Sequence, residues 1–158
     1  MLPDYEIVLG GGIGKILFGI TKEELVEILG IADEIEKPDD VKGLNWKVYN
    51  YDSIGCSFSF NSDFEERRTE ISIENGYFHI HNLIRVALKK EELLKLGSKL
   101  KLGKKVIEDL RSEEYPAREL ISYAQSGLDF YLDDKIISAI RISPLYSKEG
   151  FVIWSNNP

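Results

Sequence analysis

The sequence has few of the residues that form disulfide bonds in exported proteins or bind metal ions. Its 158 residues include one cysteine, Cys56, and two histidines, so an internal disulfide is excluded. No apolar run approaches the roughly 20 residues that a membrane-spanning helix needs. The N-terminus lacks the basic and apolar regions of a secretory signal. We therefore expect a protein of the reducing cytoplasm that makes no contact with a membrane.

Positive charge is scarce as well. The formal net charge is −7, which argues against nucleic acid as a partner, because such binding depends on cationic contacts to phosphates. Residues 1–75 hold 7 Lys and Arg against 16 Asp and Glu, whereas residues 76–158 hold 13 against 11. An acidic half beside a near-neutral half suggests a partner with a basic face. A surface that only keeps the protein in solution would show the same bias.

The sequence also lacks a complete motif for catalysis or for binding a cofactor. The stretch GGGIGK at 10–15 resembles a phosphate-binding loop, but that motif would need glycine and Ser or Thr where the chain has Leu9 and Ile16. The acidic pair Asp133–Asp134 falls in an expected turn, where aspartate is favoured for backbone hydrogen bonding. Because no set of side chains specifies a reaction or a cofactor, we expect a protein that is not an enzyme.

What the sequence does contain is internal similarity. Residues 14–28 align with 82–96, and the sequence Lys-Glu-Glu-Leu coincides in both. Residues 51–60 align with 123–132, and further blocks match in the same order. The sequence therefore predicts an α+β fold of two tandem helix-plus-antiparallel-sheet repeats, with the helices on one face of the sheet. The repeats would be residues 1–75 and 76–158, joined in one compact domain.

Local signals place the expected elements. The first helix should start at Thr21 as N-cap and end at Gly30, and the second should end at Gly97. Alternating apolar and polar residues predict strands. The expected strands cover 45–51, 56–60, 69–74, 77–81, 128–132 and 136–143. Residues 98–122 read as one or two further helices.

If the helices cover the apolar side of the sheet, the other side carries a tyrosine-rich set with a few charges. This mixture is typical of protein interfaces, although an ordinary solvated sheet face would also fit. The candidate partner-binding residues are Tyr49, Tyr51, Glu74, Tyr77, His79, His81, Asp129, Tyr131 and Arg141. His79 and His81 could instead chelate a metal with Glu74 or Asp129, but two histidines without cysteine are a weak metal signal.

The segment GKILFGITKEELVEILGIADEI resembles a motif of the small lipoprotein in the outer-membrane β-barrel assembly machine. The same motif recurs in the tandem-repeat β-lactamase-inhibitor-protein family. The fuller pattern is similar to a group of bacterial proteins, some of which look like immunity proteins. The resemblance implies a cytoplasmic inhibitor that neutralises a cognate toxin, such as a basic nuclease, through the open sheet face. A scaffold or envelope-assembly module is the alternative that it leaves open.

Overall fold

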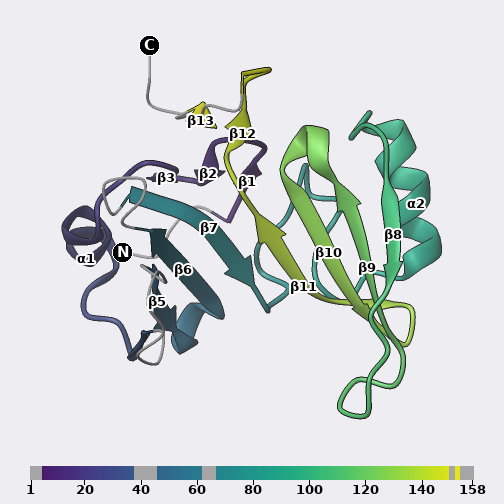
Figure 1. Ribbon diagram of the computed structural model, residues 1–158, viewed down its shortest axis with the longest axis horizontal. Coiled ribbons are helices and arrows are strands. Elements are labelled where there is room, and N and C mark those ends of the chain that lie inside the picture. Colours follow the sequence, from purple (N-terminus) through teal and green to yellow (C-terminus); the bar gives the residue numbers. More distant parts are fainter. Residues whose placement is uncertain (1–4, 38–45, 62–66, 150–151, 154–158) are drawn as a thin grey trace.

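The computed structural model describes residues 5–37, 46–61, 67–149 and 152–153 of the chain. Within them lie two short helices, α1 (Lys22–Leu29) and α2 (Lys90–Lys99), and a much larger number of strands. An eight-stranded sheet runs through the whole molecule, with the order β4-β5-β6-β7-β11-β10-β9-β8 (Figure 1). Each neighbouring pair in this sheet is antiparallel.

The strands of the large sheet are mostly short. They are β4 (Glu34–Glu36), β5 (Trp46–Tyr51), β6 (Cys56–Asn61), β7 (Arg67–Ile73), β8 (Val106–Asp109), β9 (Arg118–Tyr123), β10 (Leu128–Asp133) and β11 (Ile136–Ile142). A three-stranded sheet and a strand pair complete the set: β1 (Ile7–Val8), β2 (Gly12–Ile13) and β3 (Ile16–Leu17), then β12 (Leu145–Tyr146) and β13 (Val152–Ile153).

The predicted fold class is therefore wrong. The chain is mostly sheet, with two short helices and one continuous eight-stranded sheet, instead of two helix-plus-sheet repeats. Residues 98–99 end α2, but the rest of the segment 98–122 contributes β8 and most of β9 rather than helices. Pairing of β8 with β9, and of β9 with β10, overrides the helical preference of its Glu, Leu and Arg residues. The extra three-stranded sheet at the N-terminus was not expected either.

Helix α1 begins and ends as the sequence predicts, whereas α2 ends later than predicted. The Thr21 hydroxyl accepts the backbone N–H of Glu24 at 3.2 Å, so the predicted N-cap of α1 is confirmed. Gly30 ends α1, as predicted, with a positive φ of 85°. Helix α2 continues to Lys99, so the predicted end at Gly97 is wrong. Gly97 lies buried inside the helix, where the side chain of Tyr123 packs against it.

Two hairpins, one in each half of the sheet, share one geometry. Between β5 and β6 the chain makes a single 3-10 turn, Asp52–Ile54, and then reverses at Gly55 with φ 63° and ψ 36°. Between β9 and β10 it makes the same turn at Ala124–Ser126 and reverses at Gly127 with φ 66° and ψ 35°. Glycine suits both positions because this left-handed conformation strains residues with a Cβ atom.

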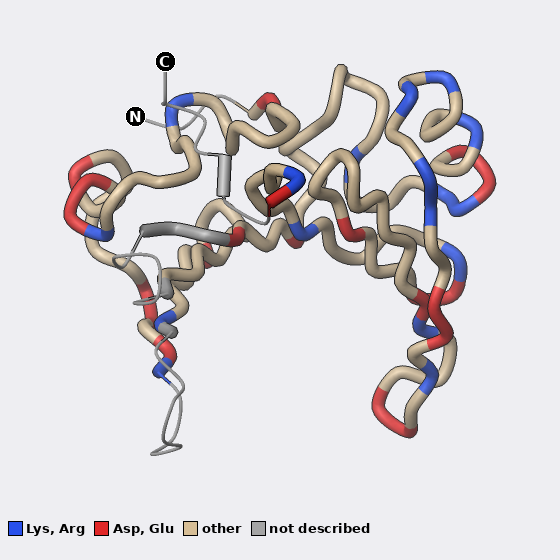
Figure 2. Tube along the Cα trace, turned by 45° about the horizontal axis from the view of Figure 1, so that its top comes forward, with Lys and Arg blue, Asp and Glu red and all other residues tan. Residues whose placement is uncertain are grey.

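The sheet curves into an arch, and the two helices lie on its convex side (Figure 2). Along β10 the side chains of Leu128, Phe130 and Leu132 are buried, whereas the residues between them are only half-buried. This alternation places one face of the sheet against the core and leaves the other open. Phe18, from the N-terminal segment, belongs to the same buried cluster as Phe130. The concave side of the arch faces away from this core, and we call it the outer face.

Candidate functional site

The outer face carries one polar side chain from each of six neighbouring strands. Cross-strand register places these residues in line across the sheet, and each is half-buried. We call this set the polar row; it consists of Asn50, Ser57, Ser72, Arg141, Asp129 and Ser122. No described helix covers this side of the arch (Figure 2).

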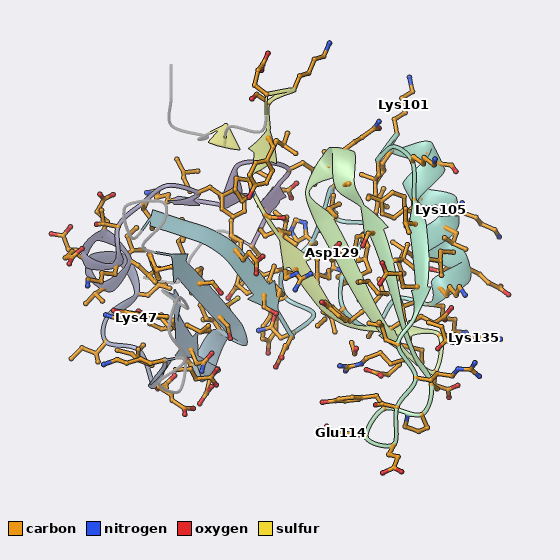
Figure 3. The ribbon with its side chains drawn as sticks, viewed as in Figure 1. Lys47, Lys101, Lys105, Glu114, Asp129 and Lys135 are labelled. Carbon is orange, nitrogen blue, oxygen red and sulfur yellow. The ribbon has the colours of Figure 1, made fainter. Side chains whose placement is uncertain are left out.

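Charge is concentrated in the second half of the row. Arg141 donates from Nε and Nη2 to Oδ2 of Asp129, at 3.1 and 2.7 Å. The hydroxyl of Ser122 donates to the other carboxylate oxygen of Asp129 at 2.7 Å. Desolvation lowers the pKa of Arg141, but the hydrogen bond to Asp129 and the charge of Glu70 outweigh it and raise this pKa. Arg141 and Ser122 therefore hold the side chain of Asp129 in one position from its two sides. Asp129 lies near the centre of the sheet, as Figure 3 shows.

Tyrosine and arginine alternate beside the row. The guanidinium carbon of Arg141 lies 5.5 Å from the ring centre of Tyr131, and that of Arg118 lies 5.8 Å from the same ring. Arg118 also stacks on Tyr115 at 3.5 Å. Asp133 holds Arg118 through two hydrogen bonds of 3.0 and 2.9 Å. Tyr115, Arg118, Tyr131 and Arg141 form what we call the Tyr–Arg ladder, which cation–π attraction stabilises.

In the first half the row is neutral. The Ser57 hydroxyl donates to Oδ1 of Asn50 at 2.6 Å, in the position that Ser122 and Asp129 occupy in the second half. The amide of Asn50 in turn donates to Glu36 at 3.2 Å. Glu34 and Glu36 extend the outer face along the β4 edge and leave that end acidic.

Two of the predicted contact residues lie on the wrong side of the sheet. Tyr49 and Tyr51 are in the core, with 8% and 4% of their surface exposed. Tyr51 donates its hydroxyl to the carbonyl of Gly30 at 2.9 Å, which ties β5 to the end of α1. Burial raises the pKa of this phenol. The register of the 45–51 strand could not be read from its sequence because apolar and aromatic residues occupy both of its faces.

The segment 77–81 is not a strand of the large sheet, so Tyr77, His79 and His81 do not join the outer face. Glu74 follows the end of β7 and is exposed. The Nδ1 atom of His79 lies 2.9 Å from Glu6, and that of His81 lies 3.9 Å from it. In the part of the chain that the structure describes, no group of three or more His, Cys, Asp or Glu side chains is placed to hold a metal ion.

Of the predicted residues, Asp129, Tyr131 and Arg141 are brought together on the outer face. Sequence reasoning missed Tyr115, Arg118 and Ser122, which complete the polar row and the ladder. All three lie in the segment that was expected to be helical. The signal that could have found the last two was the alternation in RELISY, where Ile121 and Tyr123 are buried and their neighbours are not.

A second surface feature is an open hollow of about 400 Å³ beside the start of α2. Two ion pairs line it: Lys90 pairs with Glu119 at 2.6 Å, and Arg111 pairs with Asp109 at 2.6 Å. Arg118 of the Tyr–Arg ladder lines the hollow as well, together with Asp134 and Lys135.

Comparison with known proteins adds a likeness of fold. No protein-family model and no curated protein matches the chain. The crystal structure of an extracellular protein containing an SCP domain from Bacillus anthracis str. Ames aligns with a TM-score of 0.50 and 12% sequence identity. The alignment covers 80% of this chain and 44% of that one, so this chain spans less than half the length of its structural neighbour. The likeness is one of fold, over the aligned part of each chain. Among the described helices, none is long and apolar enough to cross a membrane.

Proposed function

We propose that this protein is a non-catalytic binding module that holds a protein partner against the outer face of its eight-stranded sheet. The observation that carries the proposal is the Tyr–Arg ladder beside the fixed Asp129–Arg141 pair, on a curved face that the described helices leave open. Tyrosine and arginine are the residues that most often dominate binding energy at protein interfaces.

The geometry lowers the cost of binding in a specific way. Arginine and tyrosine side chains normally lose rotamer freedom when a partner immobilises them. Here Arg118 is already held by Asp133 and Tyr115, and Arg141 is held by Asp129. Their unused N–H groups and the ring of Tyr131 are therefore offered in fixed positions.

A more specific version of the proposal states what kind of protein the partner is. The acidic first half, with Glu34 and Glu36 on the β4 edge, favours a basic protein. Together with the resemblance to immunity proteins, this supports an inhibitor that neutralises a cognate toxin in the cytoplasm. An assembly or scaffold module is the alternative, and it would use the same surface for a partner that is harmless by itself.

The test compares two single substitutions. A tagged chain captures its partner from the native host, and the capture is repeated with Tyr131→Thr and with Tyr77→Thr. Tyr131 is part of the ladder, whereas Tyr77, with 66% of its surface exposed, lies off the sheet. We expect Tyr131→Thr to lose the partner and Tyr77→Thr to keep it. Equal capture by both variants would remove the outer face from the proposal.

A second experiment distinguishes a toxin inhibitor from an assembly or scaffold module. The captured partner is expressed in a susceptible bacterium, alone and together with this protein. Growth arrest that is relieved by the wild-type chain but not by Tyr131→Thr supports a toxin inhibitor. A partner that is harmless when expressed alone would refute the inhibitor and favour the assembly module.

A further inference from the structure

The large sheet ends in two edge strands, β4 and β8. Every residue of β8 is exposed, including Val106 at 52% and Ile107 at 45%. An open edge with apolar side chains usually pairs with another strand or is protected from doing so. The charges around β8 have both signs: Lys104 and Lys105 precede it, and Glu108 and Asp109 end it.

The pairing with β9 fixes which backbone groups of β8 face outward. The N–H of Leu110 donates to the carbonyl of Arg118 at 3.0 Å. In an antiparallel ladder, hydrogen-bonded pairs alternate with non-bonded pairs, so Glu108 and Val106 also turn their backbone groups toward β9. The N–H and C=O groups of Lys105, Ile107 and Asp109 therefore point away from β9, toward the open edge.

We propose that β8 pairs antiparallel with β8 of a second copy of this chain, with Ile107 opposite Ile107 on the two-fold axis. In this register Lys105 of each copy lies opposite Asp109 of the other. The three outward-facing residues of one copy meet the three of the other, and each opposed pair exchanges both N–H···O bonds. Two copies of a short strand thereby satisfy each other's free backbone groups and cover Ile107.

The alternation of backbone groups excludes most other registers. An outward-facing residue must oppose another outward-facing residue, so the strands slide only in steps of two residues. One step in one direction places Ile107 opposite Lys105, and one step in the other places it opposite Asp109. In both cases an apolar side chain faces a charge and the Lys105–Asp109 pairs are lost. The register centred on Ile107 alone matches charge with charge and apolar with apolar.

The β4 edge does not allow two copies to pair with opposite charges facing each other. If two copies paired through β4 about Ile35, Glu34 of one would oppose Glu36 of the other. Like charges directly opposite one another in a sheet are destabilising. Charge therefore favours β8 for self-pairing and protects β4 from it.

Pairing through β8 would also affect the outer face. A two-fold axis perpendicular to the sheet leaves the outer faces of both copies on the same side of the enlarged sheet. Lys105 lies at the β8 end of the molecule, far across the sheet from Lys47 on β5 (Figure 3). The dimer would present two Tyr–Arg ladders in one direction, which suits a partner that is itself two-fold symmetric.

The test uses sedimentation velocity at low salt on the full chain and on charge variants. We expect a concentration-dependent dimer for the wild type. Lys105→Glu and Asp109→Lys should each weaken it by about tenfold, since each places like charges opposite one another twice. An equimolar mixture of the two variants should restore the dimer, because the mixed pair again opposes opposite charges at both positions. Lys104→Glu makes the same change of charge outside the register and should dimerise like the wild type.

Ile107→Pro is the second variant. Proline removes an N–H that faces the open edge and leaves the bonds to β9 in place, so the fold should persist while the dimer is lost. A wild type that stays monomeric at millimolar concentration would overturn the proposal. A mixture that associates no better than its two components, or an Ile107→Pro variant that dimerises normally, would also overturn it. Growth into open-ended oligomers would point to β8 pairing with β4 instead, and would refute the two-fold arrangement.

Discussion

Gly97 lies inside α2, where helix propensity alone favours alanine by about 1 kcal/mol. A Cβ atom at this position would overlap the hydroxyl and ring of Tyr123, which packs against the helix from β9. Overpacking of this kind typically costs about 1–3 kcal/mol. We therefore expect Gly97→Ala to lower the free energy of unfolding, measured by urea denaturation, despite its better propensity.

The matched control is Ser98→Ala, one residue further along the same helix. Ser98 is exposed, so alanine there gains helix propensity and meets no neighbour. Combining Gly97→Ala with Tyr123→Phe should recover part of the loss, because the phenolic oxygen is the atom nearest to the new methyl group. A stabilising Gly97→Ala would show that Tyr123 does not hold this position.

Ala87 has a φ of 82°, a conformation that strains a residue with a Cβ atom. Its N–H donates to the carbonyl of Ile137 at 2.8 Å, which fixes the backbone at this point. Gly19, at the aligned position of the first half, has a similar φ of 91°. Ala87→Gly should raise the melting temperature, with a gain of about 1 kcal/mol. Ala117→Gly, at an exposed site outside the positive-φ region, should lower it instead.

At the scale of elements, the pairing of β9 with β10 makes one contact sensitive to acid. Arg118 lies opposite Asp133, and its hydrogen bonds lower the pKa of that carboxyl from the ordinary value of 3.8. Because the unfolded chain takes up this proton more readily than the folded one, stability should fall as the pH drops below about 4. The effect is modest, since Asp133 is 35% exposed. Asp133→Asn should make the loss of stability between pH 4 and 2 shallower, as followed by urea denaturation at each pH.

The neighbouring turn residue supplies the comparison. Asp134 is exposed and makes no ion pair with any described residue, so Asp134→Asn should leave the acid dependence as it is in the wild type. Identical acid profiles for all three proteins would mean that Arg118 does not act on the Asp133 carboxyl in solution.

Elements were predictable where the sequence alternates cleanly. The strands Cys56–Asn61 and Leu128–Asp133 follow from alternating apolar residues, and the turn at Asp134 and Lys135 follows from its acidic pair. Prediction failed at 106–109 and 118–123, where pairing with the neighbouring strands overrides a helical preference, although the alternation in RELISY favours a strand. The same failure hid Tyr115 and Arg118, which are half of the Tyr–Arg ladder, and Ser122 of the polar row.

At the scale of the whole molecule, the arch separates two roles of the sheet. Its convex side buries the aromatic core, and its concave side carries the polar row and the ladder (Figure 2). The choice of face for Asp129, Tyr131 and Arg141 was predictable because their strands alternate clearly. The placement of Tyr49 was not, because only the packed structure shows which side of β5 the core occupies.

Charge is also distributed at this scale, and it yields the last prediction. If a basic partner docks on the outer face, the acids of the β4 edge should accelerate its approach. Replacing both Glu34 and Glu36 by glutamine should slow association several-fold at low salt and leave dissociation nearly unchanged, as measured by stopped-flow. Replacing Glu91 and Glu92 of α2 removes the same charge from the convex side. Equal slowing by both pairs would show that net charge alone steers the partner, whereas slowing by the β4 pair alone would show that the field of the outer face does.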